Sequence, residues 1–265
     1  AGAEDGDSLD VFDLHVRAFG GAADQRFPFL NEQRWRSLFA WPAGRERGLS
    51  VAPRPRGVTT DDPDSTEDLD PDVAATLRSD ETLAPLVDGH GPLPVEPAAD
   101  PFRRLCVSII NQQLSTASAA AIRERAFALL DDEVTPDAVL SADEDALREA
   151  GLSGTKVDYL RSAAAAFEGE DALSRERLAA LSDDEVREEL TAIRGVGAWT
   201  ADMFLIFVLG REDVLPLGDL AVRKGIEQVY ADGGELSRAE MREIGDRWRP
   251  YRSYGTRYIW AAYED

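Results

Sequence analysis

The chain has 265 residues, of which 43% are hydrophobic, so it is long enough to bury the core of one moderate or two small domains. No apolar run is long enough to span a membrane, and the acidic start, residues 1–7, lacks the core of a signal peptide, so we expect a cytoplasmic protein. The one cysteine, Cys106, excludes an internal disulfide and a four-cysteine metal cluster, and the formal net charge of −22 opposes general affinity for polyanions.

Residues 1–70 show no clear helical pattern. Residues 48–58 contain prolines that argue against a regular sheet, and the acidic run 61–72 is typical of an exposed linker. We therefore divide the chain into an N-terminal extension with its linker, residues 1–70, and a domain, residues 71–265. An aromatic-rich group in the extension should pack against something: Phe27, Phe29, Leu30, Trp35, Leu38, Phe39 and Trp41.

Helical spacing begins at 72–87, and a strong helix start follows at Asp100-Pro101, with a capping side chain before a proline at the first helical position. The polar stretch 111–115 interrupts this helix, and a second one resumes at 117–130. Further helices are predicted at 142–149, 155–168, 183–193, 198–209, 219–230, 237–248 and 253–263. The predicted class is all-α: two helical lobes with a cleft between them.

Two of these helices, 183–193 and 198–209, are separated by a hairpin that contains Gly195 and Gly197. Glycine permits positive φ and close approach of the backbone to a ligand. The second helix begins with unpaired amides and the positive end of its dipole, which together favour an anion such as a phosphodiester. A plain helix-turn-helix corner with glycine at a helix end is the alternative.

Asp219 follows a break at 213–218 and stands at the start of the helix predicted next. Aspartate is a good N-cap, so a structural role is sufficient to explain it. The cap role is compatible with a second one, because a helix start would hold the carboxylate still. Asp202 and Asp213 are weaker candidates, since neither follows a break that exposes it.

The pattern Arg194-Gly-Val-Gly-Ala-Trp-Thr-Ala201, followed by Pro216-x-Gly-Asp219, resembles the helix-hairpin-helix (HhH-GPD) DNA glycosylase superfamily. More narrowly it is similar to the 3-methyladenine DNA glycosylase II type. The resemblance covers residues 72–265. It implies a DNA-binding cleft with the hairpin at its rim, where Gly195, Gly197 and Thr200 contact DNA.

The resemblance implies base excision repair of double-stranded DNA, in which a damaged nucleotide is rotated out of the helix. Leu114 aligns with the wedge that fills the gap. Gln112 and Gln113 either bond base edges near the lesion or tie down the helix break. Asp219 would stabilise the positive charge that develops on the sugar and orient a water for attack.

Trp199 and Trp260 match family positions that line the base pocket, although either one could also be a core tryptophan. Aromatic faces attract electron-poor, cationic alkylated purines. Met203 stands where relatives often have tyrosine, which predicts a softer pocket and a shifted substrate range. Arg252, in a Trp-x-Pro-Tyr-Arg-Ser segment also seen in the family, either contacts a phosphate or braces the cleft.

Relatives that also cut the strand use a lysine just past the hairpin, where this chain has Trp199, so we expect hydrolysis without lyase activity. His15, His90 and Cys106 make no metal-ligand cluster, so no catalytic metal or other cofactor is implied. Hairpins of the family often bind a monovalent cation. We expect a monomer that is associated with the nucleoid.

Acidic residues outnumber basic ones by 51 to 29, and only Lys156 and Lys224 are lysines. This composition is typical of proteins from a very salty cytoplasm, where screening lengths shrink to about 3 Å at 1 M salt, so we expect a halophilic source. Segments 101–130 and 247–260 carry local charges of +3 and +4, and 194–224 is neutral. The segments expected to face DNA therefore escape the acidic bias.

The sequence thus predicts a monofunctional glycosylase for N-alkylated purines. The alternatives are a glycosylase for oxidised or deaminated bases, and a noncatalytic binder of DNA that uses only the hairpin. Asp219 and the two tryptophans favour an enzyme, because a binder needs neither.

Overall fold

The computed structural model describes residues 68–114, 116–169 and 172–264, and all its regular elements in these ranges are helices. This confirms the all-α class. The aromatic group of the N-terminal extension and the 48–58 segment lie outside the described residues. The first described helix begins at Pro71. Because the structure does not describe residues 1–67, the proposed division at residue 70 stays a prediction.

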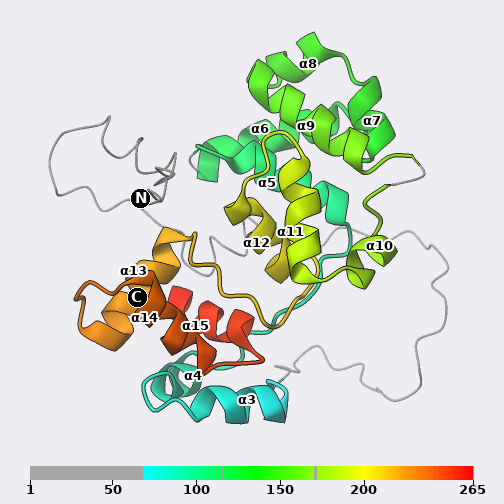
Figure 1. Ribbon diagram of the computed structural model, residues 1–265. Coiled ribbons are helices and arrows are strands. Elements are labelled where there is room, and N and C mark those ends of the chain that lie inside the picture. The colour runs from blue at the N-terminus through cyan, green and yellow to red at the C-terminus, as the bar shows by residue number, and fades with distance from the viewer. Residues whose placement is uncertain (1–67, 115, 170–171, 265) are drawn as a thin grey trace, which may run out of the picture.

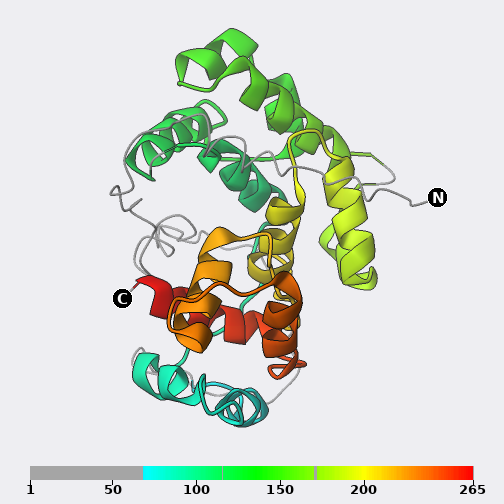
Figure 2. The same cartoon turned by 60° about the vertical axis from the view of Figure 1, so that its left-hand side comes forward.

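The helices form two lobes (Figures 1 and 2). The first lobe contains the middle of the chain: α5 (Pro101–Asn111), α6 (Thr116–Ala128), α7 (Pro136–Ser141), α8 (Glu144–Glu149), α9 (Gly154–Ala166), α10 (Arg175–Ala180), α11 (Asp183–Ala192) and α12 (Ala198–Phe207). The second lobe joins the two ends of the described chain: α3 (Pro71–Arg78), α4 (Ala84–His90), α13 (Leu220–Ala231), α14 (Arg238–Asp246) and α15 (Arg252–Glu264).

Several predicted boundaries are confirmed by their caps. The Asp100 carboxylate accepts a hydrogen bond from the Arg103 amide at 2.9 Å, with Pro101 in the first turn, so α5 begins where expected. Ser182 and Glu185 form a capping box at the start of α11. The structure differs from the sequence prediction in three places. The 72–87 helix is two helices with a turn around Asp80, a short α7 precedes α8, and α10 was missed.

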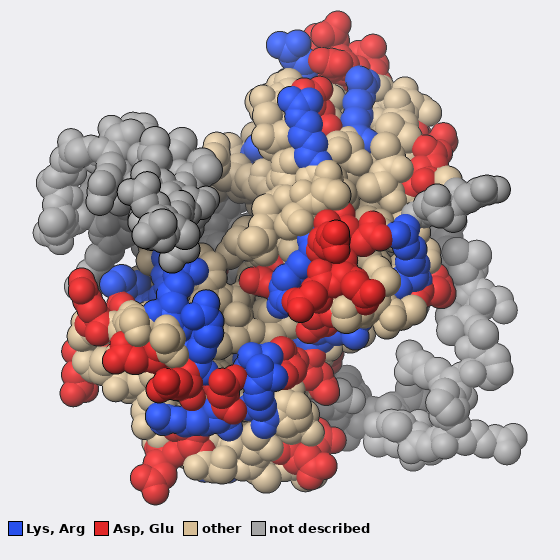
Figure 3. Space-filling model, viewed as in Figure 1, with Lys and Arg blue, Asp and Glu red and all other residues tan. Residues whose placement is uncertain are grey.

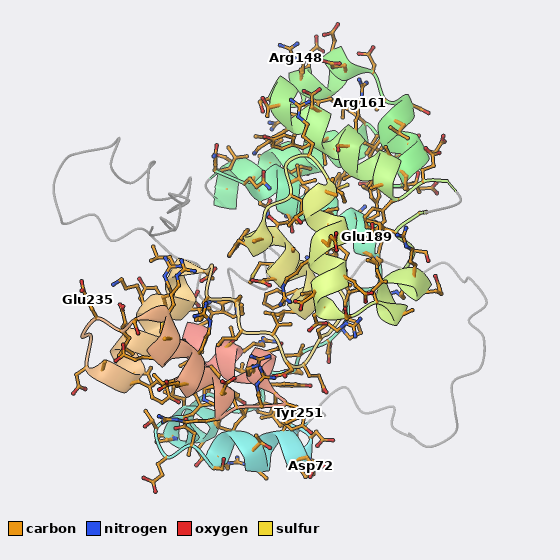
Figure 4. All side chains as sticks on the ribbon, in the orientation of Figure 1. Asp72, Arg148, Arg161, Glu189, Glu235 and Tyr251 are labelled. Carbon is orange, nitrogen blue, oxygen red and sulfur yellow. The ribbon has the colours of Figure 1, made fainter. Side chains whose placement is uncertain are left out.

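The second lobe is closed by contacts between residues far apart in sequence. The buried Asp80 carboxylate accepts hydrogen bonds from the Tyr230 hydroxyl at 2.9 Å and from the Trp248 indole at 3.3 Å. The Tyr258 hydroxyl donates to the Gly91 carbonyl at 2.8 Å, which joins α15 to the end of α4. Tyr251, just before α15, lies beside Asp72 of α3 (Figure 4).

The arrangement of α13 against α15 depends on a glycine. A Cβ on Gly225 would lie 2.6 Å from the Ile259 side chain and 2.8 Å from the Ile259 carbonyl, so only glycine allows the two helices this close. The middle of α13 is thereby held against the buried face of α15. None of the helices in the described ranges is long and apolar enough to cross a membrane.

Candidate functional site

Asp219 stands at the N-terminus of α13, as predicted. Its Oδ1 accepts a hydrogen bond from the Val222 amide at 3.0 Å, so the carboxylate caps the helix. The residue is only 8% exposed, and Arg223 secures the preceding loop by donating to the carbonyls of Leu217 and Gly218. The cap and the braced loop therefore both restrain the carboxylate.

Both predicted pocket tryptophans donate their indole N–H to this carboxylate. Trp199 Nε1 lies 2.6 Å from Asp219 Oδ2, and Trp260 Nε1 lies 3.3 Å from Oδ1. Trp199 comes from α12 of the first lobe and Trp260 from α15 of the second, so the carboxylate lies where the lobes meet. Trp260 is buried, whereas Trp199 is 39% exposed and reaches the surface. Asp219, Trp199 and Trp260 therefore form one cluster, as the sequence predicts.

The two competing carboxylates are engaged elsewhere. Asp202 Oδ1 pairs with Arg187 Nε at 2.8 Å; burial raises the pKa of Asp202, and Arg187 opposes this. Asp213 pairs with Arg252 at 2.6 Å and with Arg249 at 3.0 Å. Both of these carboxylates pair with arginines, whereas Asp219 accepts hydrogen bonds from the two tryptophans.

One residue of this cluster was missed. Phe207 stacks on Trp260, with ring centroids 5.6 Å apart and an angle of 24° between the planes. Trp199, Met203 and Phe207 follow one another at four-residue spacing on α12, so their shared face was visible in the sequence. Met203 is buried on this face, 2% exposed. Its contact with a substrate stays a prediction.

The hairpin between α11 and α12 has the expected glycine geometry at one of its two positions. Gly195 has φ +91°, and a Cβ there would overlap the Tyr159 ring. Gly197 has φ −98° and is the N-cap of α12 without a side-chain cap, so its value lies in absent bulk rather than positive φ. Thr200 is buried, 5% exposed, and its contact with DNA stays a prediction.

The break after α5 forms a second surface feature, which we call the wedge loop (residues 112–114). Leu114 is 36% exposed, unusual for a large apolar side chain, as its predicted role requires. Gln113 is exposed, with φ +56°. Gln112 Nε2 donates to the Gly195 carbonyl at 3.0 Å. Of the two roles considered for Gln112, the structure supports tying down the break.

Of the two roles predicted for Arg252, the structure supports bracing, and its contact with a phosphate stays a prediction. Its guanidinium donates to the Asp213 carboxylate at 2.6 Å and to the Asp213 carbonyl at 2.9 Å, and its side chain is 18% exposed. Arg252 therefore braces the loop that leads to Asp219, which was the alternative role.

Other arginines of the basic segments are also used inside the fold. Arg125 donates to the Ala150 carbonyl, Arg103 to the Asp132 carbonyl, and Arg257 to the Pro94 carbonyl. These guanidinium groups therefore supply hydrogen-bond donors to backbone carbonyls as well as positive charge. In Figure 3, blue and red groups are interspersed on the second lobe, red groups cover α11, and mostly uncharged surface lies between the lobes.

The described residues contain no group of three histidine, cysteine or acidic side chains placed to hold a metal ion. Cys106 is fully buried, and burial raises the pKa of its thiol. A monovalent cation at the hairpin stays a prediction.

Comparison with known proteins places this geometry in context. The family described as "HhH-GPD superfamily base excision DNA repair protein" matches residues 106–250. DNA-3-methyladenine glycosylase 1 of Schizosaccharomyces pombe is 30% identical over 180 residues, which are 67% of this chain and 79% of that protein.

Two solved structures share the fold. A DNA-3-methyladenine glycosidase from Bacillus halodurans superposes with a TM-score of 0.68 at 33% identity, over 74% of this chain and 90% of its own. The Schizosaccharomyces pombe 3-methyladenine DNA glycosylase in complex with abasic DNA gives a TM-score of 0.63 at 29% identity, over 71% and 95%.

Proposed function

Because the chain belongs to the HhH-GPD superfamily of base excision DNA repair proteins, we propose that it is a DNA glycosylase that removes N-alkylated purines of the 3-methyladenine type and leaves an abasic site. One observation carries the proposal. A buried carboxylate, Asp219, is held by two indole N–H groups and one amide where the two lobes meet.

This carboxylate suits the chemistry of glycosidic cleavage. As the bond between C1′ and the base nitrogen breaks, its electron pair leaves with the base and positive charge develops on the sugar. An immobile carboxylate stabilises that charge without reorganising. A water molecule then adds its hydroxyl to C1′ and gives up a proton, with Asp219 as the nearby acceptor.

The tryptophans favour a cationic base. Both indoles donate their N–H to Asp219, and of the two rings Trp199 is the one that is exposed and can offer its surface to a substrate. Electron-rich indole faces attract alkylated purines, which carry positive charge and are good leaving groups that need little acid catalysis. This supports an alkylpurine substrate over an oxidised or deaminated base.

We propose hydrolysis without strand cleavage. A lyase needs a lysine free to attack C1′. Lys156 Nζ donates to the Ile110 and Gln112 carbonyls at 2.6 and 2.8 Å, and Lys224 Nζ pairs with Glu227 at 2.6 Å. Borohydride should therefore trap no covalent adduct on substrate DNA; a trapped adduct would overturn this part of the proposal.

The test is a base-release assay on duplexes that carry methylated purines, 8-oxoguanine or uracil, run at low and at high salt. We expect release from methylated DNA. Release only from oxidised or uracil-containing DNA would identify the other glycosylase class, and binding without release from any duplex would identify a noncatalytic binder.

The salt series also tests the proposed halophilic source. A protein of net charge −22 that acts on DNA in a salty cytoplasm, associated with the nucleoid, should keep its activity in molar salt. Loss of release above about 0.2 M salt, as in ordinary DNA-binding proteins, would contradict that origin.

A further inference from the structure

One face of α9 contacts both loops that are expected to touch DNA. Lys156, Tyr159 and Ser162 are spaced by three residues, so they lie along one side of the helix. Lys156 contacts the end of α5, which leads into the wedge loop. Tyr159 packs against Gly195, and the Ser162 hydroxyl accepts a hydrogen bond from the Arg194 amide at 3.2 Å. The helix is therefore a common support for the wedge loop and the hairpin.

Lys156 caps the C-terminus of α5. Its ammonium group donates to the carbonyls of Ile110 and Gln112, two of the groups that a helix end leaves unpaired. The chain contains 27 arginines and two lysines, yet a lysine occupies this position. A compact ammonium with three rotatable donors can reach two carbonyls at a tight helix end, where a planar guanidinium is much less suited.

Gln112 then connects the wedge loop directly to the hairpin. Its side-chain amide donates to the Gly195 carbonyl across 83 positions of sequence. Immediately after it, Gln113 adopts positive φ and Leu114 projects into solvent. The direction of Leu114 is thus set two residues after a point that is hydrogen-bonded to the hairpin.

We propose that Gln112, supported by Lys156, is a positioning residue that couples the grip of the hairpin on the strand to insertion of Leu114 and extrusion of the damaged nucleotide. This inference rests on the proposed function. The hairpin fixes the distance from the bound backbone, and the hydrogen bond transmits that position to the wedge.

The experiment compares the double variant Gln112→Leu, Asp219→Asn with Asp219→Asn alone, because the Asp219→Asn change suppresses base release in both proteins. Extrusion is measured by the fluorescence of 2-aminopurine placed beside the lesion, and affinity is measured on the same duplex and on an undamaged one. We expect extrusion to fall about five- to tenfold, the effect of one lost hydrogen bond, while affinity for undamaged duplex changes less than about twofold.

Gln228→Leu is the matched control. Gln228 also donates its side-chain amide to a backbone carbonyl, that of Ala262 at 3.2 Å, but within the second lobe. This variant should leave extrusion unchanged. An equal loss in both variants would show a general structural effect and would overturn the proposal.

Leu114→Ala supplies the second test. If Gln112 acts through the wedge, Gln112→Leu should add less than about twofold to the loss caused by Leu114→Ala, whereas independent effects would multiply. In the Asp219-containing enzyme, release from a lesion in an unpaired bulge should be nearly normal for Gln112→Leu, because extrusion is already complete. Multiplied effects, or no rescue by the bulge, would overturn the coupling.

Lys156→Arg tests the support. We expect a folded protein with a smaller loss of extrusion than Gln112→Leu, and wild-type extrusion in this variant would remove Lys156 from the proposal. Extrusion and binding are measured in Asp219→Asn proteins, so these measurements do not depend on base release. A wild-type enzyme that releases no base would therefore refute the proposed function, while the fluorescence series would still decide the coupling.

Discussion

The two lobes hold their functional groups in different ways. In the first lobe, the wedge loop and the hairpin are positioned by bonds to backbone carbonyls and amides, from Gln112, Lys156 and Ser162. In the second, Asp219 is positioned by a helix cap and a buried aromatic environment. The first arrangement suits surfaces that must adapt to a strand, and the second suits a group that must not move during a reaction.

Trp199 is the residue that links these two functions. Its backbone lies in the first turn of α12, directly after the hairpin, and its indole N–H donates to the Asp219 carboxylate of the second lobe. The difference between the lobes therefore predicts separable defects. Changes at Asp219 in the second lobe should slow base release and leave DNA binding intact. Changes in the hairpin should weaken DNA binding and leave the chemical step intact. Changes at Trp199 should affect both.

The largest expected effect is that of Asp219→Asn. Asparagine can still cap α13, so the fold should be kept. The lost negative charge should lower single-turnover base release about a thousandfold, while the dissociation constant for damaged DNA changes less than about threefold. Unchanged release would exclude Asp219 as the catalytic group.

The Trp199 indole would face the new amide nitrogen in this variant, donor against donor. Asp219→Asn combined with Trp199→Phe removes that conflict and serves as the control. The double variant should be as inactive as Asp219→Asn alone but no less stable to urea.

Gly195→Ala tests the grip of the first lobe. The substitution brings a Cβ onto the Tyr159 ring at a residue with φ +91°, so it should lower the free energy of unfolding by about 1–3 kcal/mol and weaken DNA binding by roughly tenfold or more. Urea unfolding and equilibrium titration with duplex measure the two effects.

Gly197→Ala is the matched change. This glycine has φ −98°, and a methyl group added to it would meet no heavy atom within 4 Å, so stability should change by less than about 0.5 kcal/mol. Binding should still weaken, because a methyl group would stand at the N-terminus of α12. Normal binding by Gly197→Ala would show that the DNA backbone does not approach this amide.

Trp199→Phe should slow base release less than Asp219→Asn does. It keeps an aromatic ring but removes the hydrogen bond of 2.6 Å to the Asp219 carboxylate. Bonds to charged groups contribute about 1.5–3 kcal/mol, so release should slow by roughly tenfold or more. Trp260→Phe removes a longer bond, 3.3 Å, to an oxygen that also accepts from Val222, and should slow release less. The reverse order would contradict this assignment of the two indoles.

The smallest effect concerns the acid stability of each lobe. Hydrogen bonds from Ser182 lower the pKa of Glu185 in the first lobe, and hydrogen bonds from Ser237 lower that of Glu240 in the second. A carboxylate with a lowered pKa stabilises the fold above its unfolded pKa of about 4.3, and this contribution is lost as the pH falls through the folded pKa.

Urea unfolding between about pH 3 and pH 7 should therefore show stability that falls with acid. Ser182→Ala and Ser237→Ala should each flatten this dependence by a similar amount, because the two capping boxes have the same geometry. An unchanged pH dependence in both variants would show that the boxes do not contribute.

Local signals in the sequence were sufficient for much of the fold. Asp100-Pro101, Ser182 with Glu185, and Asp219 each act within one turn of their own helix, so the residues that define these helix starts are adjacent in sequence. The prediction of one helix over 72–87 was wrong because Asp80 turns the chain there. Its Oδ1 accepts hydrogen bonds from the Thr82 and Leu83 amides at 3.0 and 3.2 Å, and its Oδ2 accepts from Tyr230 and Trp248. The first two bonds are local to the turn, whereas the bonds to Tyr230 and Trp248 depend on tertiary packing.

The sequence by itself determined the helical class, the hairpin, and the residue types that assemble into the site, because helix periodicity and capping are properties of neighbouring residues. Tertiary structure alone decided that Arg252 braces a loop, that Phe207 stacks on Trp260, and that Gln112 holds Gly195. Each of these depends on which distant segment lies opposite a side chain, and packing of the whole chain sets that.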